Sequence, residues 1–303
     1  MTDDVWPVIP ESWADTYATL HMWSQVVGKV ALALAPPLNH SWGIAMQVTP
    51  RGLATRPLPH GRRSFTIEFD FVEHHLHIRV SDGSHRSLTL EPRSVADFHA
   101  LLMTTLDAMQ LPVRIWPMPV ELPAPIRFTD DVRSSYDADS AATFWRILVQ
   151  CERVLTMART PFIGKTSPAH FFWGAFDLAL TRFSGRPAPP REGPYWMTEA
   201  YSHEVISHGF WPGSGPVPYP AFYAYAAPSP AGFDAAPVLP EQAFYHRELG
   251  EFVLPYEAVR TADDPDRALV DFIDTTYSAA ADLAGWDRAA LERRAAGSPA
   301  SQA

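Results

Sequence analysis

Apolar residues recur with helical spacing in four long segments of the chain. In the first segment, Leu20, Trp23, Val27 and Val30 lie three or four residues apart, which places them on one face of a helix. Pro36 and Pro37 follow and end this helix. The same spacing and its capping residues predict helices over residues 13–34, 95–109, 141–159 and 265–283.

Alternating apolar and polar residues predict strands elsewhere. Phe65, Ile67 and Phe69 alternate with Thr66 and Glu68, as expected for a strand with one buried face. Asp82-Gly83 predicts the turn of a hairpin. The segment 170–183 is apolar on both faces, which favours a central strand. The full set of predicted strands is 42–49, 65–71, 76–80, 88–90, 170–183, 205–210, 222–226 and 248–255.

The order of these elements predicts an α+β fold with mostly antiparallel strands. Residues 11–111 and 140–290 each run from a long helix through strands to a closing helix, so the halves could be an internal duplication. His40-Ser41-Trp42-Gly43 is matched by His170-Phe171-Phe172-Trp173-Gly174, although repeats of long period are easily overestimated. Since no linker separates the halves, we predict one compact unit over 1–295 and a disordered tail over 296–303.

Composition narrows the class of protein. A chain of 303 residues with 47% hydrophobic residues can bury a large core, which excludes a wholly disordered protein. The net charge of −10 disfavours nucleic acid as a partner. No apolar stretch reaches the roughly 20 residues of a membrane span, and the start of the chain lacks the pattern of a signal peptide. We therefore expect a soluble, cytoplasmic protein without a membrane partner; its oligomeric state stays open.

Sulfur and amine groups are scarce. Cys151 is the single cysteine, so neither an intramolecular disulfide nor a zinc cluster of cysteines can form. Lysine occurs only as Lys29 and Lys165, and the other basic residues are arginine. Gly164-Lys165-Thr166 is similar to the end of a phosphate-binding loop, but Arg159 stands where that loop needs its first glycine. Lys165 therefore remains only a candidate anion-binding residue near His170.

Several polar side chains are candidates for chemistry. Asp177 lies among apolar neighbours, so a buried carboxylate there should be ion-paired, protonated or bound to a metal. His203-Glu204 followed by His208 is not a zinc-protease helix, because the histidines are five residues apart instead of four. His203 and Glu204 could still bind a metal or transfer protons. The alternatives are a structural ion pair for Asp177, and surface or core hydrogen-bonding positions for the others.

Two weaker patterns complete the candidates. His75 and His77 share a strand face with a spacing that suits metal binding, but no third ligand is close in sequence, which favours a solvated sheet face. Aromatic residues gather in the second half, where they could line a pocket or simply fill the core. They are Trp173, Phe210, Trp211, Phe222, Tyr223 and Tyr225.

Much of the chain resembles a bacterial family known as DUF5996, a domain of unknown function. The resemblance rests on the segments 20–21, 27–30, 39–42, 49–53, 164–174, 181–186, 202–205, 209–213 and 249–252. His170-Phe171-Phe172-Trp173-Gly174 is the most specific of these segments. The resemblance implies a single unit of about this length. It implies no activity, substrate or cofactor.

Together these observations predict a small-molecule enzyme with its pocket in the second half. His170, His203 and Glu204 are the expected acid–base residues, or the ligands of one divalent metal, and Asp177 supports them. The expected pocket residues are Trp173, Phe210, Trp211 and Lys165. The alternative is a non-catalytic ligand-binding or protein-interaction protein, in which the histidines are hydrogen-bonded in the core.

Overall fold

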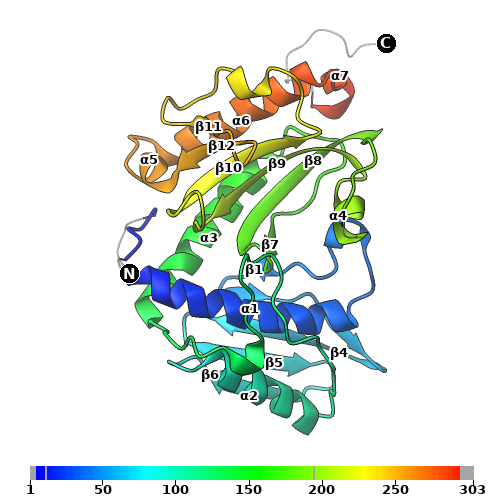
Figure 1. Cartoon of the computed structure of the whole chain (residues 1–303), viewed down its shortest axis with the longest axis vertical. Helices are drawn as coiled ribbons and strands as arrows, with labels where there is room; N and C mark the ends of the chain where they lie inside the picture. Colours follow the sequence, from blue (N-terminus) through cyan, green and yellow to red (C-terminus); the bar gives the residue numbers. More distant parts are fainter. Residues whose placement is uncertain (1–4, 11, 194, 294–303) are drawn as a thin grey trace. The chain divides into compact units, whose positions relative to one another are not determined.

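The computed structural model describes residues 5–10, 12–193 and 195–293 (Figure 1). The chain divides into two compact units. The first contains the residues up to Gln150 together with His170–Leu178, and the second contains Cys151–Ala169 together with the chain from Ala179 onward. The described part has seven helices and two antiparallel sheets of six strands each, an α+β fold as predicted. The internal duplication and the single unit over 1–295 stay predictions.

The first unit combines two helices with a sheet of short strands. Its sheet has the order β1-β2-β4-β5-β6, and β3 pairs with β4. Its elements are α1 (Trp13–Leu34), β1 (Gln47–Val48), β2 (Gly52–Ala54), β3 (Leu58–His60), β4 (Arg63–Asp70), β5 (His75–Val80), β6 (His85–Thr89) and α2 (Val95–Ala108). A third helix, α3 (Ala138–Ala158), starts in this unit and continues into the second.

Aromatic contacts join the helices of the first unit to its sheet. Trp23 of α1 stacks on Phe98 of α2 with ring centroids 4.7 Å apart, and Phe69 of β4 lies 6.3 Å from Phe98. The alternation predicted for residues 65–71 is confirmed, since Phe65, Ile67 and Phe69 are all buried. These inward residues and the apolar faces of the two helices form the core.

Local signals set the ends of several elements as expected. Ser94 caps α2, because its Oγ accepts a hydrogen bond of 3.0 Å from the backbone N–H of Asp97. Asp264 caps α6 in the same way through Arg267 N–H, also at 3.0 Å. The hairpin turn at Asp82-Gly83 joins β5 to β6, and Gly83 adopts a left-handed φ of 87° there.

The second unit packs helices on a larger sheet. The sheet order is β11-β12-β10-β9-β8-β7. α6 packs on β9 and β10 and buries Leu269, Phe272 and Ile273. By the division into units, β7 (His170–Phe172) and the first two residues of β8 (Asp177–Pro187) are counted with the first unit. The other elements of the second unit are α4 (Tyr195–Ala200), β9 (His203–Trp211), β10 (Ala221–Ala227), β11 (Phe244–His246), β12 (Glu251–Pro255), α5 (Tyr256–Arg260), α6 (Pro265–Leu283) and α7 (Arg288–Leu291).

Two predicted strands are wrong. Residues 170–183 do not form one strand, because a turn at 173–176 separates β7 from β8, and Phe176 has a φ of 62° in it. Of residues 42–49 only Gln47–Val48 is a strand, after a 3₁₀ turn over Asn39–Ser41. Buried turns carry the same apolar residues as buried strands, so the pattern alone could not separate them.

None of the described helices is both long enough and apolar enough to cross a membrane. The tail predicted over 296–303 lies outside the described residues.

Candidate functional site

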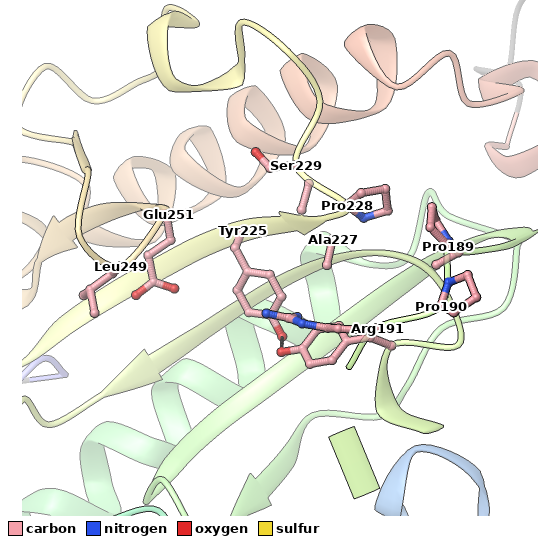
Figure 2. Close-up of a pocket in the computed structure, with 13 residues that line it drawn as sticks. Pro189, Pro190, Arg191, Tyr225, Ala227, Pro228, Ser229, Leu249 and Glu251 are labelled. Atoms are coloured by element: carbon pink, nitrogen blue, oxygen red, sulfur yellow. Dashed lines mark hydrogen bonds between the residues drawn. The ribbon is translucent and has the colours of Figure 1, made fainter. Parts of the chain in front are cut away.

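The second unit contains an open groove of about 470 Å³ (Figure 2). Its walls come from the segment after β8, from the end of β10 with the loop that follows, and from the turn before β12. Pro189, Pro190 and Pro228 give these walls a rigid backbone. The polar lining residues are Arg191, Tyr201, Tyr225, Ser229 and Glu251.

Two tyrosine rings, tilted by 53° to each other, and a guanidinium form one side of the groove. The Arg191 guanidinium lies 4.6 Å from the Tyr201 ring centroid, and the hydroxyls of Tyr201 and Tyr225 are 3.3 Å apart. Figure 2 shows Leu249 and Glu251 at one end of the groove and Pro189 and Pro190 at the other. Arg191 itself is exposed, so its N–H donors can reach a bound molecule.

The alternation of β10 places Tyr225 in this groove. Its neighbour Ala224 faces the other way and is fully buried. Phe222, two residues before Ala224, packs against Tyr256 of α5 on that buried side. Tyr223 lies on the side of Tyr225, and the two rings stack at 6.0 Å. Of the aromatic residues proposed from the sequence to line a pocket, Tyr225 is the one that lines this groove.

A smaller pocket of about 200 Å³ adjoins the groove and shares the segment 226–229 with it. Glu204 lines this smaller pocket. Its Oε2 accepts hydrogen bonds from Arg186 Nε at 2.9 Å and Nη2 at 2.7 Å. Arg186 also donates to the carbonyl oxygens of Ala284 and Gly285 just after α6. Glu204 therefore orients an arginine that caps a helix end.

The other predicted acid–base residues occupy separate places. His203 begins β9, next to Glu204, so the two side chains leave the strand on opposite faces. Its Nδ1 is 3.1 Å from the Ser202 hydroxyl. His170 and Asp177 belong to the first unit, whereas His203 and Glu204 belong to the second. The site that combines His170, His203 and Glu204 thus stays a prediction.

His170 and Asp177 differ in burial. His170 is 1% exposed, and its ring is 5.9 Å from each of the Trp42 and Phe172 rings. Asp177 begins β8 and is half-buried. Asp177 is therefore less buried than its apolar neighbours in the sequence suggested, because it is the first residue of its strand and directly follows a turn.

The predicted pocket residues of the second unit belong mostly to its core or surface. Phe210 is fully buried between Phe222 and Tyr256, at 5.3 and 5.8 Å. Trp211 is half-buried against a small cluster of Val217, Ala221 and Val253. Lys165 is exposed, with its Nζ 4.9 Å from the Phe183 ring. None of these three lines the groove or the smaller pocket.

His208 has the environment of a core histidine. Its Nε2 is 3.0 Å from the Thr276 hydroxyl of α6, and the residue is 1% exposed. Burial, reinforced by the positive charge of Arg182, holds its pKa well below the usual value. His208 is therefore neutral at pH 7, which suits a hydrogen bond between a strand and a helix.

Three residues of the first unit could hold a metal. One ligand atom from each of Asp70, Glu73 and His77 lies within 4.8 Å of the other two. The group contains His77 but not His75, the other histidine of the pair that the sequence suggested. Arg51 competes for this place, because its Nε is 2.5 Å from Asp70 Oδ2 and its Nη2 is 3.1 Å from Glu73 Oε1. Burial acts to raise the pKa of Asp70, but hydrogen bonds from Arg51, Glu73 and Val72 outweigh it and lower that pKa. The arginine thus offsets one of the two negative charges of the cluster.

The family model of DUF5996, described as a family of unknown function, matches residues 6–293. The chain belongs to this family. No curated protein and no solved structure matches it. Of the DUF5996 segments recognised in the sequence, those at 27–30, 39–42 and 170–174 lie in the first unit, and those at 202–205, 209–213 and 249–252 lie in the second. The segment 249–252 includes three residues of the groove, Leu249, Gly250 and Glu251.

Proposed function

We propose that the second unit binds a small organic molecule in the groove of Figure 2. The observation that carries the proposal is a pocket of about 470 Å³ in which aromatic and proline walls surround a few polar groups. Ligand sites in proteins usually enclose about 300–1,000 Å³ and have this mixture of apolar walls and few polar groups. This corresponds to the ligand-binding alternative derived from the sequence.

The lining residues indicate the class of ligand. Arg191 can donate two parallel hydrogen bonds to a carboxylate or phosphate while its plane stays stacked on Tyr201. The Tyr225 ring offers a flat surface to a planar group. At the other end, Glu251 can accept hydrogen bonds from a ligand N–H or O–H. We therefore expect a planar or cyclic molecule with one anionic group and a donor on the far side.

Catalysis is a second candidate, and Glu204 is the residue that favours it. Glu204 lines the pocket next to the groove, so a ligand that extends past the segment 226–229 would approach its carboxylate. If the protein is an enzyme, Glu204 transfers protons. The sequence predicted this role for Glu204 together with His203 and His170, or with a divalent metal.

A cytoplasmic location is part of the proposal. Cys151 is buried and unpaired, as is common for cysteines in that compartment.

Ligand-observed NMR with a panel of small anions tests the proposal. The panel contains benzoate, 4-hydroxyphenylacetate, nicotinate and adenosine monophosphate. We expect at least one to bind wild-type protein, and Arg191→Met to weaken it by about 10- to 100-fold, because a hydrogen bond to a charged group is worth roughly 1.5–3 kcal/mol. Tyr225→Ala should also weaken binding.

Arg62→Met is the matched control, since Arg62 is an exposed arginine of the first unit. It should leave the affinity unchanged. Binding that survives in both Arg191→Met and Tyr225→Ala would place the ligand elsewhere. A panel without any binder would refute the expected ligand class.

A further inference from the structure

One of the two lysines of this chain is buried in the first unit. Lys29 lies on α1 and is only 6% exposed, which is rare for a lysine. Among the described residues, none forms a hydrogen bond or an ion pair with it. Its Nζ instead lies 5.9 Å from the centre of the Trp173 indole. Lys29 is thus a mostly buried lysine whose amine faces an aromatic ring instead of a carboxylate.

The indole beside Lys29 is held in a fixed position. Trp173 is 4% exposed, and its Nε1 donates a 3.0 Å hydrogen bond to the carbonyl oxygen of Ile44. On the helix side it lies directly against the backbone at Gly28, where a Cβ atom would be 2.0 Å from the ring. Glycine is therefore required at position 28 so that the ring can contact the helix. The wall next to the amine is rigid and apolar.

The segment that accepts the Trp173 hydrogen bond is itself strained. His40 and Ser41 have φ angles of 57° and 59°, in the left-handed region that non-glycine residues rarely adopt. Trp42 then contacts both His40 and His170, at 5.4 and 5.9 Å between rings. Strained backbone persists where the surrounding structure enforces it, and such places are often functional.

Burial gives the Lys29 amine the chemistry of a nucleophile. Removal from water disfavours the ammonium form and lowers the pKa of Lys29 below that of an exposed lysine. A larger neutral fraction at neutral pH makes the nitrogen lone pair available. Desolvated lysines next to apolar walls are the ones that form imines with carbonyl compounds.

We propose that Lys29 is a nucleophile that binds a small aldehyde or ketone as an imine, with the substrate against the Trp173 indole. The neutral amine adds to the carbonyl carbon, a C–N bond forms, and the carbonyl oxygen takes up a proton as the nitrogen loses one. Loss of this hydroxyl as water then gives the C=N bond. One amine and one carbonyl group are consumed, and one water is released, without any oxidant or reductant.

Reductive trapping tests this proposal on the intact protein. Wild-type protein is incubated with propanal, pyruvate or 4-carboxybenzaldehyde and sodium cyanoborohydride at pH 7.5, and the adducts are located by peptide mass spectrometry. Because the chain has two lysines, each adduct falls on Lys29, on Lys165 or on the α-amine. Lys165 is exposed, so steric access alone would favour it.

We expect at least one probe to label Lys29 about tenfold faster than Lys165. As the pH is raised, the labelling rate of Lys29 should reach its plateau at a lower pH than the labelling rate of Lys165. Lys165→Arg should leave the rate at Lys29 unchanged, and Lys29→Arg should abolish that adduct. If Lys165 reacts faster with all three probes, or if Lys29 reacts only after unfolding in urea, the proposal is wrong. The comparison is internal to the wild-type chain, so it does not depend on whether a Lys29 variant folds.

Discussion

Gly28→Ala should destabilise the first unit, although the same substitution normally stabilises a helix. Replacing glycine by alanine inside an exposed helix stabilises the helix by about 1 kcal/mol. At Gly28 the new Cβ would lie 2.0 Å from Cδ2 and 2.3 Å from Cε2 of the Trp173 ring. The ring, and not the helix backbone, therefore decides the sign of the effect.

The size of the effect follows from how far the ring must move. Ordinary contact begins near 3.4 Å, so Trp173 has to shift by about 1.4 Å, the difference between 3.4 and 2.0 Å. That shift breaks its 3.0 Å hydrogen bond to Ile44, and a buried donor left without a partner costs about 1–3 kcal/mol. Overpacking of the displaced ring costs roughly another 1–3 kcal/mol. After the helix gain is subtracted, we expect a loss of about 3 kcal/mol.

A double-mutant cycle separates this cause from a general loss of stability. Urea unfolding followed by circular dichroism gives the unfolding free energy of wild type, Gly28→Ala, Trp173→Ala and the double variant. In the Trp173→Ala background, Gly28→Ala should be neutral or stabilising by up to about 1 kcal/mol, because the ring it would contact is absent. An equal loss in both backgrounds, or no loss in wild type, would refute the argument.

Two further predictions concern charge in the first unit. Burial, which outweighs the hydrogen bond of His21 to the Gly174 carbonyl, lowers the pKa of His21 to about 4. As the pH falls below 6.5, the His21 side chain takes up a proton in the unfolded chain but not in the folded one. The free energy of unfolding should therefore decrease by about 1.4 kcal/mol for each pH unit between pH 6.5 and 4 because of His21. His21→Gln should reduce the pH slope of the urea midpoint, and an unchanged slope would contradict the assignment. Arg51→Met should raise the Zn²⁺ affinity of the group Asp70, Glu73 and His77 at least ~10-fold, because the competing guanidinium is removed. Isothermal titration calorimetry measures this affinity. If Asp70→Asn in the Arg51→Met background leaves the affinity raised, the zinc binds elsewhere.

The long helices were predictable because a repeating apolar face extends over many residues. Trp13–Leu34 and Pro265–Leu283 have the predicted bounds. Short elements such as β2, β3, β11 and α5 were missed, since three to five residues carry too little periodicity. The turn at 173–176 was hidden for a different reason, because its residues are as apolar as those of the flanking strands.

The groove could be predicted only in part. Tyr225 followed from the concentration of aromatic residues in the second half. Arg191, Tyr201 and Glu251 were missed, because they come from separate segments that only the sheet pairing brings together. The run of prolines before Arg191 was the one local signal, since it indicates an ordered loop instead of a flexible one. His203-Glu204 attracted attention by residue type, but for Glu204 the structure shows an ion pair with Arg186.

Lys29 was not among the candidate site residues, because the apolar spacing in the first helix predicts only one buried face. The structure buries α1 on every side between Leu20 and Ala31, so no position in that stretch offers a side chain to solvent. In an amphipathic helix a lysine between Gly28 and Val30 would simply reach water. In a helix buried all round, the same lysine has most of its side chain buried, and this burial lowers its pKa. Most of the basic residues of this chain are arginines, but position 29 is a lysine. A lysine amine can form an imine with a carbonyl compound, whereas the permanently charged guanidinium of arginine does not.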